Sequence, residues 1–436
     1  MKRELGIFES AQALTNEIFP FNAVIVLHLS NAPDKDILTQ ALKYLQTRHP
    51  LLGVHIEKEK KRYFFVSEGT PEIPLKMIDR EDEDHWLHVL EEEINTVTDF
   101  RRGPAARVTC VSGTGYDKEC ELFFTFHHAI VDAPSAVNLL HELLSLCKSL
   151  DTKESIDQAK ITPMEPRPSA EAFFPPAFKG VRRVWRIFRF ILRQVGDEFL
   201  FRLRTRGSRK APIHGSGRSK VLPMKISKET SAALWKRSVK MKITLNNLFN
   251  AAMIMAVQKH IYDGRAIPMR HFNFADLRPY LNPPQENRYL GSFFSMMRFT
   301  VNVQENPDVW ELARHISDVT YTAFKRGDKY CSNLLGRAMM RAILRFKSFR
   351  MGTTAMSYAG PLTIKKHYGK TDVHDLHAFT SNFYLGPEYT AQVRGFDKHF
   401  YWDIVYLDTD MDDVQAAVIA DEIRAILDAA VREEGE

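Results

Sequence analysis

The sequence predicts an α/β protein built from two domains, and three observations support this fold class. A chain of 436 residues is longer than one ordinary hydrophobic core organises. Both halves alternate short runs rich in β-branched and aromatic residues with segments of helical periodicity. Between them lies a proline-rich and then strongly basic stretch with the composition of a connection. We therefore expect an N-terminal lobe at 1–150, a connection at 151–220 and a C-terminal lobe at 221–436.

The N-terminal range contains strands where β-branched and aromatic residues cluster, and helices where apolar residues recur every three or four positions. Acidic residues in the first turn of the second helix suit the helix dipole. The expected strands are 22–29, 62–66, 73–78, 106–111 and 121–126, the last two forming a hairpin, and the expected helices are 34–49, ended by Pro50, and 81–97.

The connection holds a basic amphipathic helix from Val181 to Val195. One helical face carries Val181, Val184, Trp185, Phe188, Ile191, Leu192 and Val195, and the arginines lie largely off that face. Between Lys179 and Lys220 the only acids are Asp197 and Glu198. One interpretation is a membrane-surface element, or a site for an anionic partner such as a carrier protein or lipid head group. The alternative is a helix packed on the body with its arginines in water.

The C-terminal range repeats the mixture of helices and strands, with a hairpin near its end. A loop is expected at 357–362, and a solvated loop at 367–377, where His374 and His377 have a spacing that metal ligands also use. The expected helices are 227–241, 244–261 and 411–431, and we also expect a strand that runs into a loop within 270–281 and a hairpin within 390–409 that turns near Asp397.

Several classes of function are disfavoured by what the sequence does not contain. It has no G-x-S-x-G segment for a serine hydrolase, no glycine-rich phosphate loop and no nucleic-acid-binding motif beside its basic patch. Its four cysteines show no C-x-x-C spacing, so we expect no metal and a reduced cytoplasm. No apolar run reaches membrane-spanning length and no secretory signal is evident. We expect a cytoplasmic protein, peripheral to the membrane if the basic helix docks there.

The candidate chemistry lies in "FFTFHHAIVDAPSAVNLLHELL", Phe123 to Leu144. Two histidines end an apolar run, an aspartate follows four residues after the second, and a proline suits the first turn of a helix. Histidine exchanges protons near neutral pH, and the end of a strand holds such a group on a rigid scaffold. An aspartate can anchor the loop or the ring. From the residues alone, a general base and an ordinary polar loop stay open alternatives.

"HHAIVDA" resembles the H-H-x-x-x-D-G signature of the chloramphenicol-acetyltransferase-like superfamily, and four further segments resemble that superfamily in the expected order. They are "LQTRHPLL" (45–52), "FADLRPYL" (274–281), "YLGSFFSMM" (289–297) and "SYAGPL" (357–362), so the similarity runs over nearly the whole chain. The superfamily includes peptide condensation domains, alcohol acetyltransferases, plant BAHD acyltransferases and polyketide-associated acyltransferases. The resemblance implies two lobes, each a mixed β-sheet flanked by helices, with a tunnel between them.

Carried over, His128 would be the general base midway along that tunnel, and His127 would be structural. Asp132 would also be structural, paired with Arg278. Gly291 and Ser357 lie in the quoted segments 289–297 and 357–362, and the resemblance makes them candidate tunnel-lining residues. Two departures stand out: Ala133 replaces the final glycine of the signature, and the plant-type D-F-G-W-G segment is absent, which disfavours a plant-type enzyme.

The resemblance therefore implies an acyltransferase that moves an acyl group from a coenzyme A or phosphopantetheine thioester to a hydroxyl, by direct transfer. No cofactor is expected to be permanently bound. The acceptor would be a small molecule or lipid, and any acyl carrier protein would come from another chain. Two alternatives stay open: an amide-forming condensation enzyme, and a non-catalytic binding or docking module on the same fold.

Overall fold

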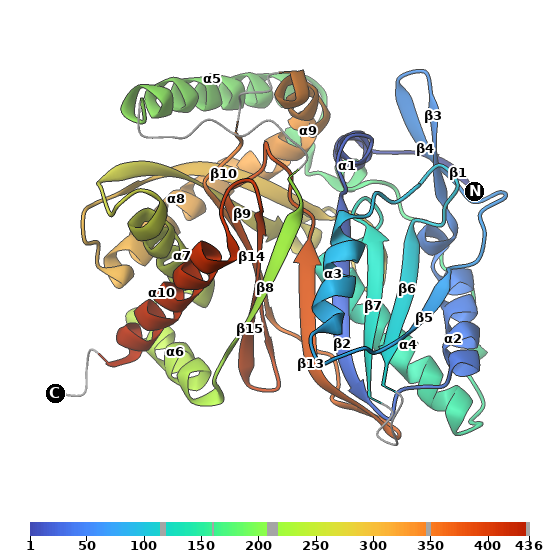
Figure 1. Ribbon diagram of the computed structural model, residues 1–436. Helices are drawn as coiled ribbons and strands as arrows, with labels where there is room; N and C mark the ends of the chain where they lie inside the picture. The colour runs from blue at the N-terminus through green and yellow to red at the C-terminus, as the bar shows by residue number, and fades with distance from the viewer. Residues whose placement is uncertain (114–118, 159–160, 207–216, 346–349, 433–436) are drawn as a thin grey trace. The chain divides into compact units, whose positions relative to one another are not determined.

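The computed structural model describes residues 1–113, 119–158, 161–206, 217–345 and 350–432. The chain forms two compact units. Unit 1 comprises Met1–Phe174, Leu277–Phe294 and Pro361–Ser381, and unit 2 comprises Pro175–Asp276, Ser295–Gly360 and Asn382–Glu436. Each unit contains a six-stranded mixed sheet with helices packed beside it (Figure 1), so the expected two-lobed α/β class is confirmed.

The units are not contiguous stretches of chain, unlike the ranges expected from the sequence. Two segments of the expected C-terminal lobe, Leu277–Phe294 and Pro361–Ser381, belong to unit 1. The expected connection at 151–220 divides between the units at Phe174, and parts of it, 159–160 and 207–216, lie outside the described residues. The reason is pairing at long range: these two segments find their partners in the N-terminal sheet and helices, not among their sequence neighbours.

The main sheet of unit 1 is built around β7, every residue of which is buried. The continuous apolar run that ends in the two histidines therefore forms a central strand. All pairings are antiparallel except that of β5 with β6. The strand order is β12 (His367–Tyr368), β13 (Thr371–Thr380), β2 (Asn22–Ser30), β7 (Cys120–His127), β6 (Ala106–Ser112) and β5 (Leu75–Asp79).

A second, three-stranded sheet and four helices complete unit 1. In the three-stranded sheet, β4 (Arg62–Val66) lies between β1 (Lys2–Glu4) and β3 (His55–Glu59). Helix α3 packs across β2 and β7, and α2 packs against α4. The helices are α1 (Ile7–Asn16), α2 (Lys35–Arg48), α3 (His85–Asn95) and α4 (Ala133–Asp151), with 3₁₀ turns η1 (Pro50–Gly53), η3 (Ala170–Phe173) and η5 (Arg278–Tyr280).

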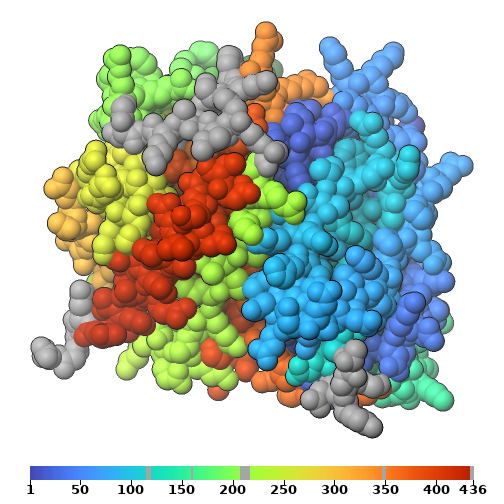
Figure 2. All heavy atoms as spheres, viewed as in Figure 1, coloured from blue at the N-terminus to red at the C-terminus, as the bar shows by residue number. Residues whose placement is uncertain are grey.

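The sheet of unit 2 packs against α7, which is buried nearly all round and contacts α8 and α10. The strand order of this sheet is β10 (Phe294–Val303), β9 (Ile267–Asp276), β11 (Thr354–Pro361), β14 (Tyr389–Phe396), β15 (His399–Leu407) and β8 (Ser219–Ile226). The helices are α5 (Gly180–Arg204), α6 (Lys228–Met241), α7 (Leu245–Ile261), α8 (Val309–Arg326), α9 (Asp328–Arg345) and α10 (Asp413–Arg432), with a 3₁₀ turn η4 (Pro176–Phe178). Figure 2 shows α10, in red, at the surface, which fits its alternation of buried and exposed residues.

The sequence predicts the two hairpins correctly, since β6 pairs with β7 and β14 with β15. Two loop predictions are wrong. Residues 357–361 belong to β11, which pairs in parallel with β9, and most of 367–377 lies in β12 and β13. Strand β13 pairs with β2, more than three hundred residues away in sequence. Local composition does not record such a pairing, because a strand gains its backbone partners from its neighbours in space.

The paired histidines of that second segment differ in their surroundings. His377 is buried in β13 and His374 is exposed. Within the described ranges, no cluster of three His, Cys, Asp or Glu side chains is placed to hold a metal ion. Nor does any helix in those ranges combine the length and the apolar character needed to cross a bilayer.

Candidate active site

The two candidate histidines occupy the end of β7 and the turn that follows it. His127 is the last residue of β7, and α4 begins at Ala133. Asp132 caps α4 by accepting hydrogen bonds from the Ser135 backbone N–H (3.1 Å) and hydroxyl (2.6 Å). Because Ala133 is the first helical residue and has no positive φ, the alanine that replaces the usual glycine is not strained.

One hydrogen bond fixes the protonation pattern of His128. Its Nδ1 lies 3.0 Å from the backbone carbonyl oxygen of Val131. A carbonyl only accepts, so Nδ1 must carry the hydrogen, and in the neutral ring Nε2 then keeps an unshared electron pair. This is the tautomer that a general base acting through Nε2 requires. The orienting group is thus a backbone carbonyl within the turn, not the carboxylate of Asp132.

Two aromatic rings stack on the imidazole of His128. Phe21 and Phe294 stack on it with ring centroids 5.6 Å and 5.0 Å away, and Phe8 meets Phe294 edge to face at 5.1 Å. The rings restrict the orientation of the imidazole, which is partly buried. Burial lowers the pKa of His128 below its ordinary value of 6.5, and the bond to Val131 partly opposes that shift. The neutral ring is therefore favoured at physiological pH.

His127 is placed differently from its neighbour. Its ring is fully buried, its Nδ1 accepts the Ala129 N–H (3.1 Å), and Phe100 meets it edge to face at 5.3 Å. Burial lowers the pKa of His127 to about 3, with the nearby His128 as a smaller cause. A neutral ring that bonds its own turn supports the backbone around His128 and is not presented to solvent.

Asp132 and Arg278 form the buried ion pair that the resemblance implies. Arg278 Nη2 lies 2.8 Å and 2.9 Å from the two carboxylate oxygens, and Nε lies 3.2 Å from Oδ2. The side chains are only 2% and 1% exposed. Nη1 also donates to the carbonyl of Glu286 and Nη2 to that of Tyr289, and Oδ2 also accepts the Phe293 N–H at 3.0 Å. The pair therefore ties the start of α4 to the segment Leu277–Phe294.

Gly291 has a structural reason to be glycine. Its φ is +153°, and a Cβ there would lie 2.4 Å from the Phe293 ring, which stacks under the Arg278 guanidinium at 4.6 Å. The glycine thus allows the ring that covers the ion pair. Ser357 is partly buried in β11 of unit 2. That Gly291 and Ser357 line a tunnel stays a prediction.

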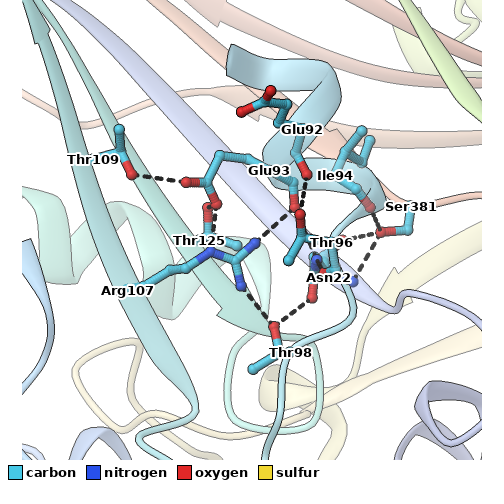
Figure 3. A network of polar contacts seen from close by, with 10 residues as sticks. All are labelled: Asn22, Glu92, Glu93, Ile94, Thr96, Thr98, Arg107, Thr109, Thr125 and Ser381. Atoms are coloured by element: carbon cyan, nitrogen blue, oxygen red, sulfur yellow. Dashed lines mark hydrogen bonds and ion pairs between the residues drawn. The ribbon is translucent and has the colours of Figure 1, made fainter. Parts of the chain in front are cut away.

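A polar network secures β7, the strand that ends at His127 just before the turn with His128 (Figure 3). The buried Glu93 of α3 accepts hydrogen bonds from the hydroxyls of Thr109 on β6 and Thr125 on β7, and from Arg107. Asn22, the register partner of His127 on β2, donates to the carbonyls at the end of α3. The network fixes α3, β2, β6 and β7 to one another beside the turn.

Part of this site was not predicted from the sequence. Phe21 belongs to no quoted motif, Phe294 lies within "YLGSFFSMM" but was given no role, and the Glu93 network joins four separate segments. The "RHP" segment of the resemblance was quoted without a role. In the structure both Arg48 and His49 bond the carboxylate of Glu142 on α4, at 3.0 Å and 2.7 Å. Helix α2 is thereby fixed to the helix that follows the histidine turn.

The comparisons with known proteins agree with this architecture. Residues 11–165 match the family model described as condensation domain, and residues 215–362 match the one described as phthiocerol/phthiodiolone dimycocerosyl transferase C-terminus. The first match contains His127, His128 and Asp132, and the second contains Arg278 and Gly291. A search of curated protein sequences found no match.

Solved structures resemble the chain over nearly its whole length. Polyketide synthase associated protein 5 from Mycobacterium tuberculosis has a TM-score of 0.71 at 16% identity, and the alignment covers 99% of each chain. The TRI3 trichothecene 15-O-acetyltransferase from Fusarium sporotrichioides has a TM-score of 0.78 at 13% identity over 99% of this chain and 96% of that one. The first condensation domain of the calcium-dependent antibiotic synthetase has a TM-score of 0.73 at 13% identity, and the alignment covers 99% of this chain and 97% of that one. At such identities the likeness shows the fold.

We predict that removing the negative charge of Asp132 destabilises the protein far more than removing an exposed one. Asp132→Asn leaves Arg278 charged and buried, which should cost about 3–5 kcal/mol in the free energy of unfolding. The matched control is Asp263→Asn, which breaks an exposed pair with Arg265 (2.6 Å) and should cost less than about 1 kcal/mol. Urea unfolding measures both, and equal costs would contradict the prediction.

We also predict that His127 makes the protein sensitive to acid. The unfolded state binds a proton near pH 6.5, but the folded pKa is about 3, so stability falls as the pH drops below 6.5 towards 3. At pH 4.5 the free energy of unfolding should be lower by about 2.7 kcal/mol because of this one group. The non-titrating variant His127→Asn should lose that much less than wild type between pH 7 and pH 4.5.

The control for this comparison is His315→Asn, which removes an exposed histidine from α8. Its unfolding free energy should fall between the two pH values by the same amount as that of wild type. A His127→Asn variant with wild-type acid sensitivity would show that the His127 ring is not held neutral by burial.

Proposed function

Because the chain has the fold of the chloramphenicol-acetyltransferase-like superfamily, we propose that it is an acyltransferase, with His128 as the general base. The observation that carries the proposal is the bond from His128 Nδ1 to the Val131 carbonyl, which leaves Nε2 as the basic atom. The donor is a thioester of coenzyme A or of a carrier-bound phosphopantetheine, and the acceptor is a hydroxyl on a small molecule or lipid.

The reaction needs one proton transfer in each direction. Nε2 of His128 takes the hydroxyl proton as the acceptor oxygen attacks the thioester carbonyl carbon, forming the C–O bond. The tetrahedral intermediate collapses, the C–S bond breaks, and the departing sulfur takes the proton back from the imidazolium. No acyl-enzyme forms, and no resident cofactor takes part. The aromatic rings around His128 favour this step because they keep the ring neutral and oriented.

Two observations support an ester product over an amide. The TRI3 enzyme is named for O-acetyl transfer, and the C-terminal family model is named for an acyl transferase, whereas the condensation family model matches only the N-terminal part. Amide formation, with an amine as acceptor and a carrier-bound donor, uses the same base and is the second candidate. A non-catalytic docking module is the third.

The test offers acyl groups of varied chain length, as acyl-CoAs or on a phosphopantetheine-loaded carrier protein, with a panel of alcohols and amines, and follows thiol release with a thiol reagent. All four cysteines of the chain are buried, which limits background from the protein itself. We expect acceptor-dependent thiol release that falls about 10²–10⁴-fold in His128→Ala. The matched control, His315→Ala, should retain the wild-type rate.

The other outcomes separate the alternatives. Release with amines alone would favour the amide-forming enzyme. Release only from phosphopantetheine-loaded carrier protein would identify the carrier as donor. Undiminished release in His128→Ala would remove His128 from the mechanism, and the absence of any acceptor-dependent release with either donor would favour the docking module.

The pH dependence of kcat/KM provides a separate prediction. Only the neutral ring accepts the proton, and burial lowers the pKa of His128 below 6.5. The acidic limb of kcat/KM, which reports the free enzyme, should therefore have its midpoint below pH 6.5. A midpoint above 6.5, measured where circular dichroism shows the fold intact, would contradict the proposed environment of His128.

A further inference from the structure

Helix α5 of unit 2 exposes an apolar face along most of its length. The side chains recur every three or four residues, as one face of an α-helix requires, and each is between 49% and 87% exposed. We call them the apolar stripe: Val181, Val184, Phe188, Leu192, Val195 and Phe199. The stripe covers 18 residue steps, or roughly 27 Å at about 1.5 Å per residue.

The opposite face of α5 attaches the helix to unit 2. Phe190 lies about half a turn of the helical wheel from Val181, and Phe190 and Phe201 are both buried. Glu198 bonds the buried guanidinium of Arg270, and Asp197 accepts the Thr300 hydroxyl at 2.9 Å. In Figure 1 α5 lies beside α9, and Arg193 pairs with Asp328 of α9 at 2.8 Å.

This arrangement is the reverse of an ordinary surface helix, which turns its apolar face to the core and its charges to water. One interpretation of the sequence was that this helix packs on the body of the protein through its apolar face, with its arginines in water. The structure packs α5 on the body through two phenylalanines and ion pairs, while the apolar stripe faces away from it. Core packing therefore does not account for the stripe.

Arginines follow one side of the stripe and line a hollow of about 510 Å³. Arg182, Arg186, Arg189 and Arg193 contribute from α5, and Arg326 contributes from the end of α8. Asp328 forms ion pairs with Arg193 and Arg326. In the described parts of the chain it is the only acidic side chain that forms an ion pair with any of these five arginines. The hollow thus carries a large positive excess next to an exposed apolar face.

We propose that this face of α5 docks on an anionic membrane surface. The apolar stripe would enter the boundary between head groups and acyl chains, and the arginine-lined hollow would receive lipid phosphates. A basic helix with an exposed apolar face and few acids on its polar side has the composition of an interfacial helix. Trp185, 61% exposed and part of the hollow, lies between the two, a position that tryptophan prefers at such interfaces.

Charge favours the membrane over a second copy of the chain. Within α5 seven arginines accompany only Asp197 and Glu198, and both acids already bond residues of their own unit. Pairing two stripes would therefore bring two sets of arginines together without compensating acids. An acidic carrier protein would satisfy the arginines but would leave the apolar stripe to be covered.

Vesicle flotation of the full chain tests the proposal, with phosphatidylcholine vesicles in one arm and mixed phosphatidylcholine and phosphatidylglycerol vesicles in the other. We expect recovery with the anionic vesicles alone, and lower recovery at high salt. Arg182→Gln with Arg189→Gln should weaken binding roughly 25-fold, at about five-fold for each basic residue near an anionic surface. Phe188→Gln with Leu192→Gln should abolish flotation.

Matched controls use exposed residues of the same unit. Val414→Gln with Val418→Gln removes exposed apolar side chains from α10, and Arg265→Gln with Arg314→Gln removes two exposed charges from other sites. Both should float like wild type, and circular dichroism should show all variants folded. Equal recovery with neutral vesicles, no recovery with either kind, or flotation unaffected by the α5 substitutions would each overturn the proposal. So would a wild-type dimer in light scattering that Phe188→Gln with Leu192→Gln converts to monomer.

Discussion

One buried carboxylate, that of Asp132, connects the parts of the candidate site in unit 1. It caps α4 through Ser135, pairs with Arg278, and accepts a backbone N–H from Phe293. Desolvating a carboxylate is costly, and the cost is offset only when nearly every oxygen lone pair finds a donor. Here the donors come from two places, Ser135 at the start of α4 and the segment Leu277–Phe294, so satisfying the charge specifies how the helix and that segment meet. That segment also carries Phe294, which stacks on His128.

The aspartate and the histidine of the motif therefore have separate tasks. In a catalytic triad a carboxylate bonds the imidazole directly and stabilises its charged form. In this chain the carboxylate is saturated by Arg278, Ser135 and Phe293, and the imidazole is oriented by the neutral Val131 carbonyl. A carbonyl fixes the tautomer without adding a negative charge, so burial, which lowers the pKa of His128, is the larger influence. The neutral ring results from that balance.

How much the sequence predicts depends on the range of the interactions. The strand, the turn and the capped helix around His128 are local, and their residues indicate them directly. The resemblance supplied Arg278, because a motif records a partner 146 residues away that periodicity does not. Strands β11 and β13, and the rings of Phe21 and Phe294, were missed because their partners lie far along the chain. The Glu93 network was missed for the same reason: the sequence predicts that β6 pairs with β7, but not that Glu93 of α3 lies against both strands.

Helix α5 shows a different limit of sequence analysis. Its periodicity indicates an amphipathic helix but does not indicate which face meets the protein, because the apolar side is the usual choice. The decisive residues are those outside the stripe: Phe190 and Phe201, and the acids that bond Arg270 and Thr300. They provide a second, smaller binding face towards the body, which leaves the longer apolar face exposed. Exposing it to water costs free energy at about 25 cal/mol for each Å² of apolar surface. An apolar environment at the stripe would recover that free energy, and the arginines beside it select an anionic one.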